Sequence, residues 1–273
     1  MDNGPKGPVG DWYKDATNIK GILMDIYGVL YDNDVAIPGS VEAIARLKAC
    51  GVPMRFCSNT SSRTTNSLAE KLRNMGFEVN NDEIFTPAPL AAKYLREKGL
   101  RPFLLIKDAL QSEFSGIDKS NPNCVLMGDA TDGFSYENLN KAFKVLTNSE
   151  KPVLLSMGRG KYYSHGEDGI ILDVGPFMKA LEYACDCDAH VIGKPSPPYF
   201  HAALEDMGLK PHEVVMIGDD INYDAGGAQG VGMKGIQVRT GKYRKSDEPH
   251  PVVTPDGYVD NLKQAIDLYL NNR

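Results

Sequence analysis

IKGILMDIYGVLYD, residues 19–32, is the stretch on which the interpretation of this chain depends. Its apolar run at 22–24 is too short for a helix and is typical of a strand buried on both faces of a sheet. The run ends at Asp25, and ligands of parallel α/β sheets bind beyond the carboxyl ends of the strands. Asp25 is therefore a candidate catalytic residue, although an aspartate at a strand end can also form a turn or cap a helix. Gly28 permits a sharp turn, and the apolar residues 29–31 predict that the chain folds back as a small flap.

The composition is that of an ordinary globular protein with one large domain or two modest ones. The chain has 273 residues, of which 42% are hydrophobic and 24% are charged, and its net charge is −6. The lack of a basic cluster argues against nucleic acid or an anionic membrane surface as a partner. No apolar run approaches the length that spans a bilayer, and residues 1–15 lack the apolar region of a signal peptide. We therefore expect no nucleic-acid partner and no membrane partner.

The cysteines and histidines indicate neither a disulfide framework nor a zinc site. There are 5 cysteines, an odd number, and the spacing of Cys185 and Cys187 matches no zinc knuckle or CxxC redox pair. Reduced thiols in a cytoplasmic protein are the expected state. The 5 histidines are scattered and form no HxxxH or HExxH pair, which argues against zinc.

Strands and helices alternate along the chain, which predicts a parallel sheet. After the flap we expect a helix at 40–50 with Ser40 as its N-cap, a strand at 52–57, and a helix at about 64–75. Strand signals resume near 190 and are followed by a helix at 198–208, strands at 213–220 and 235–241, and a final helix at 259–270. This alternation predicts a Rossmann-like α/β core.

A second α/β module interrupts this core. It contains a helix at 89–100, strands at 102–107, 124–129 and 152–157, helices near 108–116, 137–146 and 176–186, and a Gly- and Tyr-rich loop at 158–169. The predicted domains are therefore a core formed by 1–88 and 191–273 and an inserted cap domain at 89–190. Within the loop, Tyr162, Tyr163 and His165 are candidates to reach over the active site, although a solvated surface loop is an alternative.

Polar residues follow the predicted core strands at the points where those strands end. Ser58 follows the second strand, Lys194 follows the strand before GKPSP, and the motif GDDINYD at 218–224 follows another. Each has an ordinary alternative: Ser58 with Asn59 could cap a helix, Lys194 could be a surface charge, and Asp219 with Asp220 could form a turn. Their joint order is much harder to explain by chance.

These residue types suit phosphoryl transfer. A carboxylate can attack phosphorus and form an aspartyl-phosphate, and a hydroxyl with backbone N–H groups at a helix start can hold phosphate oxygens. A lysine supplies a positive point charge, and paired aspartates supply the hard oxygen ligands that Mg²⁺ prefers. Positioning and charge compensation are most of what phosphoryl transfer needs.

The chain resembles the haloacid dehalogenase superfamily of phosphatases. The resemblance rests on DIYGVL at 25–30, the strand end at Ser58, GKPSP at 193–197 and GDDINYD at 218–224, and it extends over nearly the whole chain from Gly21 onward. The position of the insertion, after the second motif, is similar to that of the C2-capped subfamily. Stretches such as RFCSNTSS, LDVGPFMKALEYAC and DGYVDNL narrow the resemblance to members that cleave P–N bonds and pyrophosphate.

The resemblance implies a Mg²⁺ site and a nucleophile. Asp25 would be both the nucleophile and a Mg²⁺ ligand, Tyr27 would ligate through its backbone carbonyl, and Asp219 through its carboxylate. Asp220 and Asp224 would support the metal site without contacting the ion.

The resemblance also implies a phosphate site. Ser58, Asn59 and Lys194 would bind the substrate phosphate beside Asp25 and Tyr27, and Lys194 would act as a catalytic residue. The implied substrates are a phosphorylated small molecule, pyrophosphate or a phosphohistidine protein, and the implied assembly is a homodimer.

Tyr27 departs from the superfamily pattern, in which an aspartate two residues after the nucleophile acts as the general acid and base. We expect a hydrolase for P–N bonds (phosphohistidine, phospholysine, imidodiphosphate) and for pyrophosphate. The alternatives are a phosphate-binding pseudophosphatase and a weak small-molecule phosphomonoesterase. A dehalogenase on the same scaffold is disfavoured, because aspartates that ligate Mg²⁺ are superfluous to it.

Overall fold

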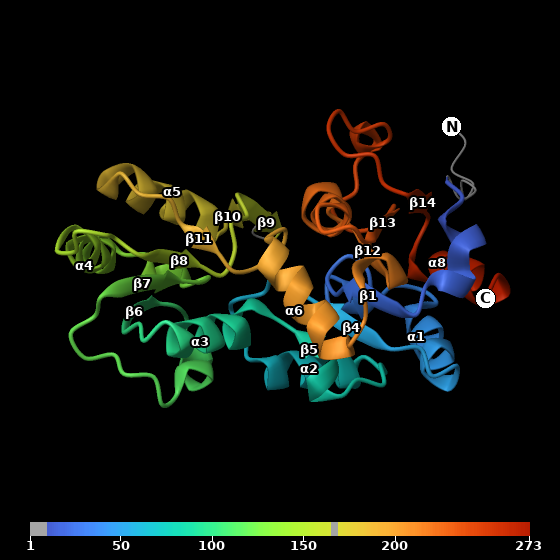
Figure 1. Ribbon diagram of the computed structural model, residues 1–273, viewed down its shortest axis with the longest axis horizontal. Coiled ribbons are helices and arrows are strands. Elements are labelled where there is room, and N and C mark those ends of the chain that lie inside the picture. The colour runs from blue at the N-terminus through green and yellow to red at the C-terminus, as the bar shows by residue number, and fades with distance from the viewer. Residues whose placement is uncertain (1–9, 165–168) are drawn as a thin grey trace. The chain divides into compact units, whose positions relative to one another are not determined.

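The computed structural model describes residues 10–164 and 169–273, which form two compact units (Figure 1). The core unit contains the chain up to Ser58, Ala69–Phe85 and Lys194–Arg273, and the cap unit contains Asn59–Leu68 and Thr86–Gly193. The predicted insertion at 89–190 lies within the longer segment of the cap unit.

A six-stranded sheet in which every pairing is parallel forms the centre of the core unit. In spatial order its strands are β14 (Gly257–Val259), β13 (Lys234–Val238), β12 (Val214–Gly218), β1 (Gly21–Asp25), β4 (Met54–Cys57) and β5 (Ile84–Phe85). The predicted α/β fold is confirmed. The residues of β1 and β12 are buried throughout, as the continuous apolar runs predict for central parallel strands.

The sheet register brings three of the predicted strand ends to one edge. In β1, Met24 pairs with Ile217 of β12, and Asp25 pairs with Cys57 of β4. Because these strands are parallel, the residues after β12 and β4 follow their strands at the same edge as Asp25.

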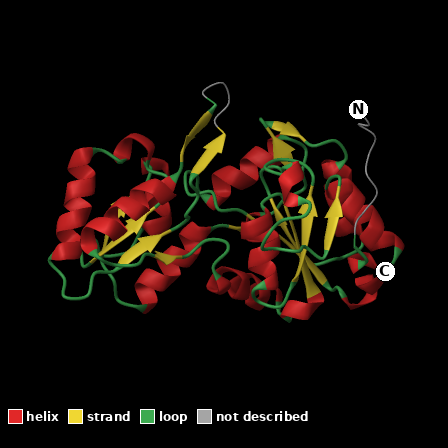
Figure 2. Cartoon of the chain, turned by 90° about the horizontal axis from the view of Figure 1, so that it is seen from above, coloured by secondary structure: helices red, strands yellow, loops and turns green. Residues whose placement is uncertain are grey.

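The helices of the core unit lie on both sides of this sheet (Figure 2). The α-helices are α1 (Ser40–Ala49), α2 (Thr65–Asn74, which crosses the unit boundary), α6 (Pro197–Met207), α7 (Gly227–Gln229) and α8 (Leu262–Asn271). The short helical turns are η1 (Trp12–Asn18), η2 (Asn81–Glu83), η6 (Pro211–Glu213), η7 (Ile221–Gly226) and η8 (Lys245–Asp247). Helix α1 packs beside α8, and α6 packs beside α7.

The expectation that Ser40 is an N-cap is wrong. Gly39, with φ +82°, occupies the N-cap position of α1, and the buried Ser40 hydroxyl lies 2.9 Å from the carbonyl of Leu30 and 2.7 Å from that of Ile37. The serine therefore ties the start of α1 to the end of the flap. That flap contains the antiparallel pair β2 (Tyr31–Asp32) and β3 (Val35–Ala36), as the sequence predicted.

The cap unit has its own parallel sheet, with the order β11 (His190–Val191), β8 (Leu154–Ser156), β7 (Cys124–Met127) and β6 (Pro102–Leu105). Its helices are α3 (Pro87–Glu97), η3 (Asp108–Phe114), η4 (Thr131–Gly133), α4 (Tyr136–Thr147) and α5 (Val174–Cys185). Residues of β7 alternate between two hydrophobic clusters: Leu126 packs with residues of α3 and η3, and Val125 packs with residues of α4 and α5.

The predicted loop at 158–169 is in part a hairpin. Strand β9 (Tyr162–Ser164) pairs antiparallel with β10 (Ile170–Leu172), so the chain reverses where Gly and polar residues predicted only a loop. His165 lies outside the described residues.

In the described part of the chain, no helix combines the length and the apolar character that crossing a membrane requires.

Candidate active site

Asp25 is a buried carboxylate at the carboxyl end of β1. Its Oδ1 atom accepts a hydrogen bond from the backbone N–H of Ile26 at 2.8 Å and lies 3.0 Å from Nζ of Lys194. Within the described residues these contacts fall on Oδ1, so Oδ2 is the oxygen that remains for nucleophilic attack. The residue is 8% exposed, so a reacting group can reach it while most water is excluded.

Lys194 holds the buried carboxylates together. Its Nζ atom lies 2.6 Å from Oδ1 of Asp224 and donates to the carbonyl of Cys57 at 3.1 Å. Burial alone would lower the pKa of Lys194, but the carboxylates of Asp224 and Asp25 outweigh burial and raise the pKa. The lysine is therefore a permanent cation beside the candidate nucleophile.

Asp25, Asp219 and Asp224 offer carboxylate oxygens within 4.8 Å of one another, which is the spacing of a metal site. Burial raises the pKa of Asp219, and the neighbouring Asp25 and Asp224 raise it further. No hydrogen-bond partner among residues 10–164 and 169–273 reaches Asp219 Oδ1, although this atom is buried. An unsatisfied buried carboxylate oxygen is costly, and a cation beside it removes the cost. The residues present therefore fit a divalent metal ion.

Asp224 and Asp220 are occupied by contacts within the protein. Oδ1 of Asp224 binds Lys194, and its Oδ2 accepts from the backbone N–H of Asp220 at 3.1 Å. The side chain of Asp220 caps η7 by accepting from the N–H groups of Asn222 and Tyr223. These contacts suit residues that orient the site, whereas the free oxygen of Asp219 suits a metal ligand.

Two glycines allow the backbone to close around Asp219. A Cβ atom on Gly28 (φ +79°) or on Gly241 (φ +60°) would lie 2.1 Å from Oδ2 of Asp219. Both glycines also have the positive φ that other residues rarely adopt. The flap and the segment after β13 can therefore approach this carboxylate only because both positions lack a side chain.

Ser58 and Asn59 directly follow β4 but belong to different units. The Ser58 N–H donates to the carbonyl of Phe85 at 2.9 Å, and the buried Tyr199 hydroxyl lies 2.7 Å from the same carbonyl oxygen. Tyr199 thus fixes the ends of β4 and β5. In the cap unit, a Cβ atom on Gly193 would lie 2.6 Å from Oδ1 of Asn59. The assignment of Ser58 and Asn59 to phosphate binding stays a prediction.

Tyr27, half-buried in the flap, replaces the expected general acid. Burial raises the pKa of its phenol to about 12, and a hydrogen bond with the Asp32 side chain contributes to the same shift. Its ring meets the Tyr31 ring edge to face, with the centroids 5.7 Å apart. A phenol with a pKa raised in this way is a poor proton donor near pH 7.

The tyrosines of the cap hairpin have different surroundings. Tyr162 is 46% exposed. Tyr163 is half-buried, and burial together with the nearby Asp129 raises its pKa to about 12. The role of this hairpin in reaching substrate stays a prediction.

Sequence reasoning missed Lys242, which lies at the same sheet edge as Asp219. Its backbone N–H donates to Oδ2 of Asp219 at 2.8 Å, and its Nζ atom lies 3.4 Å from Oδ2 of Asp220. The sequence could have indicated Lys242. This residue comes shortly after the strand β13, as other candidates come after their strands, together with Thr240 and Gly241.

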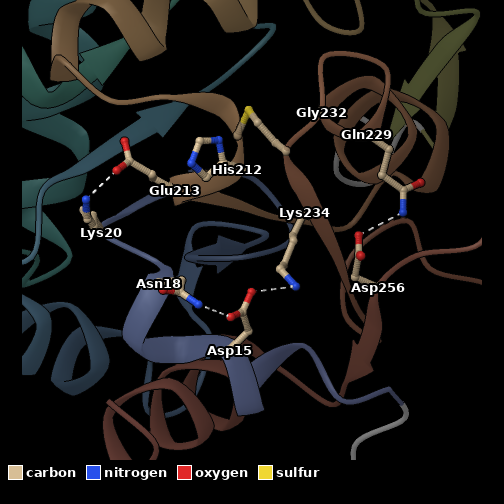
Figure 3. A pocket seen from close by; sticks show the side chains of 10 residues that line it. Asp15, Asn18, Lys20, His212, Glu213, Gln229, Gly232, Lys234 and Asp256 are labelled. Atoms are coloured by element: carbon tan, nitrogen blue, oxygen red, sulfur yellow. Dashed lines mark hydrogen bonds and ion pairs between the residues drawn. The ribbon is translucent and has the colours of Figure 1, made fainter.

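A cavity of about 600 Å³ lies at the other edge of the core sheet (Figure 3). Its lining includes Lys20, Glu213 and Lys234, which precede or begin β1, β12 and β13. Lys20 is paired with Glu213, and Lys234 with Asp15 at 3.2 Å. The charges in this cavity therefore satisfy one another, and the catalytic candidates lie at the opposite ends of the strands.

Comparisons with known proteins agree with this geometry. A haloacid dehalogenase-like hydrolase family model matches residues 22–119, and a HAD-hydrolase-like model matches residues 191–265. The chain is 54% identical over 265 residues to the phospholysine phosphohistidine inorganic pyrophosphate phosphatases of Bos taurus and Homo sapiens, covering 96% of this chain and 98% of each relative. Its fold is similar to that of the 4-nitrophenylphosphatase of Thermotoga maritima, with a TM-score of 0.85, 27% identity, and coverage of 92% of this chain and 98% of that one.

Proposed function

Because the chain belongs to the haloacid dehalogenase-like hydrolases and is a phosphatase, we propose that it hydrolyses P–N bonds and inorganic pyrophosphate. The substrates would be phosphohistidine, phospholysine, imidodiphosphate and pyrophosphate. The two relatives that are 54% identical are named phospholysine phosphohistidine inorganic pyrophosphate phosphatase, which supports this substrate class. The observation that carries the proposal is the pairing of Asp25 with Lys194 beside the unsatisfied oxygen of Asp219.

In the first proposed step, Oδ2 of Asp25 attacks phosphorus and forms an aspartyl-phosphate while the P–N or P–O bond to the leaving group breaks. Lys194 lies beside the attacking carboxylate and stabilises the negative charge of the phosphoryl group. In the second step, the oxygen of a water molecule bonds to the same phosphorus while the P–Oδ2 bond breaks. The water protons leave with the product as dihydrogen phosphate, and the Asp25 carboxylate is restored.

We propose Mg²⁺ as the cofactor, held by the carboxylates of Asp25 and Asp219 and by the backbone carbonyl of Tyr27. When bound, it would neutralise charge on the phosphate and on the nucleophile. Asp220 and Asp224 would orient the site through the contacts described above, and Ser58, Asn59 and Lys194 would bind the phosphate oxygens.

The substrate class follows from Tyr27. Alkyl phosphate esters expel a strongly basic alkoxide and need a general acid, a role for which the Tyr27 phenol with its pKa of about 12 is poorly suited. A phosphoramidate can carry a proton on nitrogen before its P–N bond breaks, and pyrophosphate expels a phosphate that cations stabilise. The site therefore favours P–N and P–O–P bonds over alkyl esters.

The proposal has three further parts, of which the homodimer rests on the family resemblance alone. The inserted cap domain would act as a lid during turnover, the protein would form a homodimer, and its location would be cytoplasmic, with the nucleus as a second location. The free thiols of Cys50, Cys57, Cys124, Cys185 and Cys187 are in keeping with a reducing compartment.

Phosphate release from a panel of substrates, measured with Mg²⁺, tests the proposed function. The panel contains pyrophosphate, imidodiphosphate, phosphohistidine, phospholysine and an alkyl phosphate monoester. We expect turnover of the first four and slow release from the monoester. Chelation of Mg²⁺ should stop turnover, and Asp25→Asn should remove it without unfolding the protein. Unchanged hydrolysis by Asp25→Asn would exclude the aspartyl-phosphate.

The second candidate, favoured by the bulk of Tyr27, is a pseudophosphatase that binds phosphate, or a weak phosphomonoesterase. Saturable phosphate binding in calorimetry, without turnover of any substrate of the panel, would establish the pseudophosphatase. Hydrolysis of the alkyl monoester at the rate of pyrophosphate would instead establish a phosphomonoesterase.

A further inference from the structure

The segment after β13 closes against the metal-binding carboxylate. Thr240 donates its hydroxyl to the carbonyl of Gly28, Gly241 makes the close approach to Asp219 described above, and the Lys242 N–H donates to Asp219 Oδ2 at 2.8 Å. The backbone at Lys242 is thereby fixed to both the flap and the site.

Ion pairs anchor this segment to the core unit. Arg239 contacts both carboxylate oxygens of Glu248, at 3.0 and 2.9 Å, and binds Asp260 at 2.9 Å. The hydroxyl of Tyr243 donates to Glu248 at 3.0 Å. Bidentate pairing of this kind gives geometric specificity as well as strength. The loop that carries Lys242 is therefore held at both of its ends.

The side chain of Lys242 differs from that of Lys194 in its access to solvent. The Lys194 side chain is 3% exposed and lies within bonding distance of Asp25 and Asp224, whereas the Lys242 side chain is 51% exposed. Its contact with Asp220 at 3.4 Å is long for an ion pair, and exposed pairs of this kind contribute little to stability. Lys242 therefore places a solvent-accessible cation beside the site at a small cost in stability.

We propose that Lys242 binds the anionic leaving group of diphosphate-type substrates, pyrophosphate and imidodiphosphate, and so favours them over P–N substrates whose leaving group is an uncharged amine or imidazole. This inference rests on the proposed function. Tyr27 is a poor proton donor, so a departing phosphate leaves as an anion that a cation can stabilise. A lysine on a four-carbon stem provides a point charge for it. A departing amine carries no negative charge and gains nothing from Lys242.

The test compares Lys242→Met with Lys242→Arg, and it uses Lys245→Met as a control for charge removal in the same exposed loop. Activity is measured with pyrophosphate and with phosphoramidate, whose leaving group has no anionic charge. Loss of a charge-assisted contact should lower kcat/KM for pyrophosphate about 10- to 100-fold in Lys242→Met. The value for phosphoramidate should stay within about threefold, because nucleophile and metal are unchanged. Lys242→Arg should keep most of the pyrophosphate activity, and Lys245→Met should match the wild type.

Calorimetric titration with methylenediphosphonate and with inorganic phosphate, in the presence of Mg²⁺, makes the test independent of turnover. Lys242→Met should weaken binding of the diphosphonate about tenfold or more and leave phosphate binding unchanged. Equal losses for both ligands, or for both substrates, would overturn the proposal, as would no loss at all. If the wild type turned over no substrate, the proposed function would fail. The affinity for methylenediphosphonate relative to that for phosphate, compared between wild type and Lys242→Met, would still decide the role of Lys242.

Discussion

The ammonium group of Lys194 lies 3.0 Å from Oδ1 of Asp25, although the whole cap unit segment Thr86–Gly193 separates these residues in the chain. Asp25 comes from the first part of the core unit, and Lys194 begins its last part. The charge pair therefore forms only when the two parts of the core fold together. The site is in this sense a consequence of the sheet order, in which β12 and β4 lie on either side of β1.

Lys194→Met should remove activity and lower stability. The substitution keeps the length of the side chain but leaves the buried carboxylates of Asp25 and Asp224 without their cation. Breaking a buried pair in this way costs about 3–5 kcal/mol of unfolding free energy. The loss of charge stabilisation at phosphorus should reduce kcat about 10²- to 10³-fold. Urea unfolding and phosphate release measure the two effects.

Lys20→Met is the matched control for Lys194→Met. Lys20 is paired with Glu213, as Figure 3 shows. Its side chain is 60% exposed, and it lies at the other edge of the sheet. An exposed pair of this kind contributes about 0–1 kcal/mol. Equal destabilisation by the two substitutions would contradict the interpretation of Lys194 as the cation of the site.

Gly28→Ala should weaken metal binding. The added Cβ atom would meet Asp219 Oδ2 at 2.1 Å, so the carboxylate or the flap must move. We expect a tenfold or greater rise in the Mg²⁺ concentration needed for half-maximal activity, and weaker Mg²⁺ binding in calorimetry. The order of magnitude follows from the loss of one well-placed charged contact, about 1.5–3 kcal/mol.

Gly51→Ala controls for the backbone strain of Gly28→Ala. Gly51 has φ +64°, and a Cβ atom there would meet nothing within 4 Å. Gly51→Ala should lower the free energy of unfolding by about 1–2 kcal/mol, the strain of an alanine with left-handed backbone angles. It should not change the Mg²⁺ dependence of activity. If Gly28→Ala behaved in the same way, the close approach to Asp219 would have no functional role.

Cys57 should resist alkylation in the native protein. Burial raises the pKa of its thiol to about 12, and the thiolate is the reactive form, so about one thiol in ten thousand is reactive at pH 8. Because the group is an acid with a raised pKa, reactivity should rise as the pH increases toward that value. Iodoacetamide labelling with peptide mapping should modify the exposed Cys50 first and Cys57 only after denaturation. Native labelling of both cysteines at one rate would refute the prediction.

The sequence was sufficient to place Asp25, Asp219 and Asp224 together, because they follow or lie near the ends of continuous apolar runs and parallel strands bring their carboxyl ends to one edge. The expectation that Lys194 follows a strand of the core sheet is wrong, because the preceding strand β11 pairs with β8 in the cap sheet. Lys194 nevertheless lies 3.0 Å from Asp25. The short strands β5 (Ile84–Phe85) and β14 (Gly257–Val259) were missed, because two or three residues carry no periodic signal.

Contacts between distant segments could not be predicted in the same way. The role of Ser40 depends on the carbonyl groups of Leu30 and Ile37, and the proximity of Lys242 to Asp219 depends on β13 lying beside β12. Strand order is set by the packing of the whole sheet, which local propensity does not report. The strands β9 and β10 of the cap unit were missed because three residues each carry no periodic signal.

Tyr27 is the position at which the chemistry of the site can be changed most directly. Its phenol has a pKa raised to about 12 by burial and by the Asp32 carboxylate, so it stays protonated and is a weak acid near pH 7. A carboxylic acid at this position would be a stronger donor, and a positioned general acid is worth about 10²- to 10⁴-fold.

Tyr27→Asp should therefore raise hydrolysis of an alkyl phosphate monoester by one or more powers of ten. Tyr27→Asn is the matched control. The asparagine amide has nearly the same shape as the aspartic acid side chain but cannot protonate an alkoxide, so this variant should show no gain in monoester hydrolysis. Steady-state phosphate release with Mg²⁺ measures both variants, and thermal unfolding checks that the flap survives the loss of the Tyr27 to Tyr31 ring contact. A wild type that already cleaves the monoester as fast as pyrophosphate would mean that another residue supplies the proton. An equal gain in both variants would mean that the bulk of the Tyr27 side chain, and not the lack of a general acid, limits hydrolysis of the monoester.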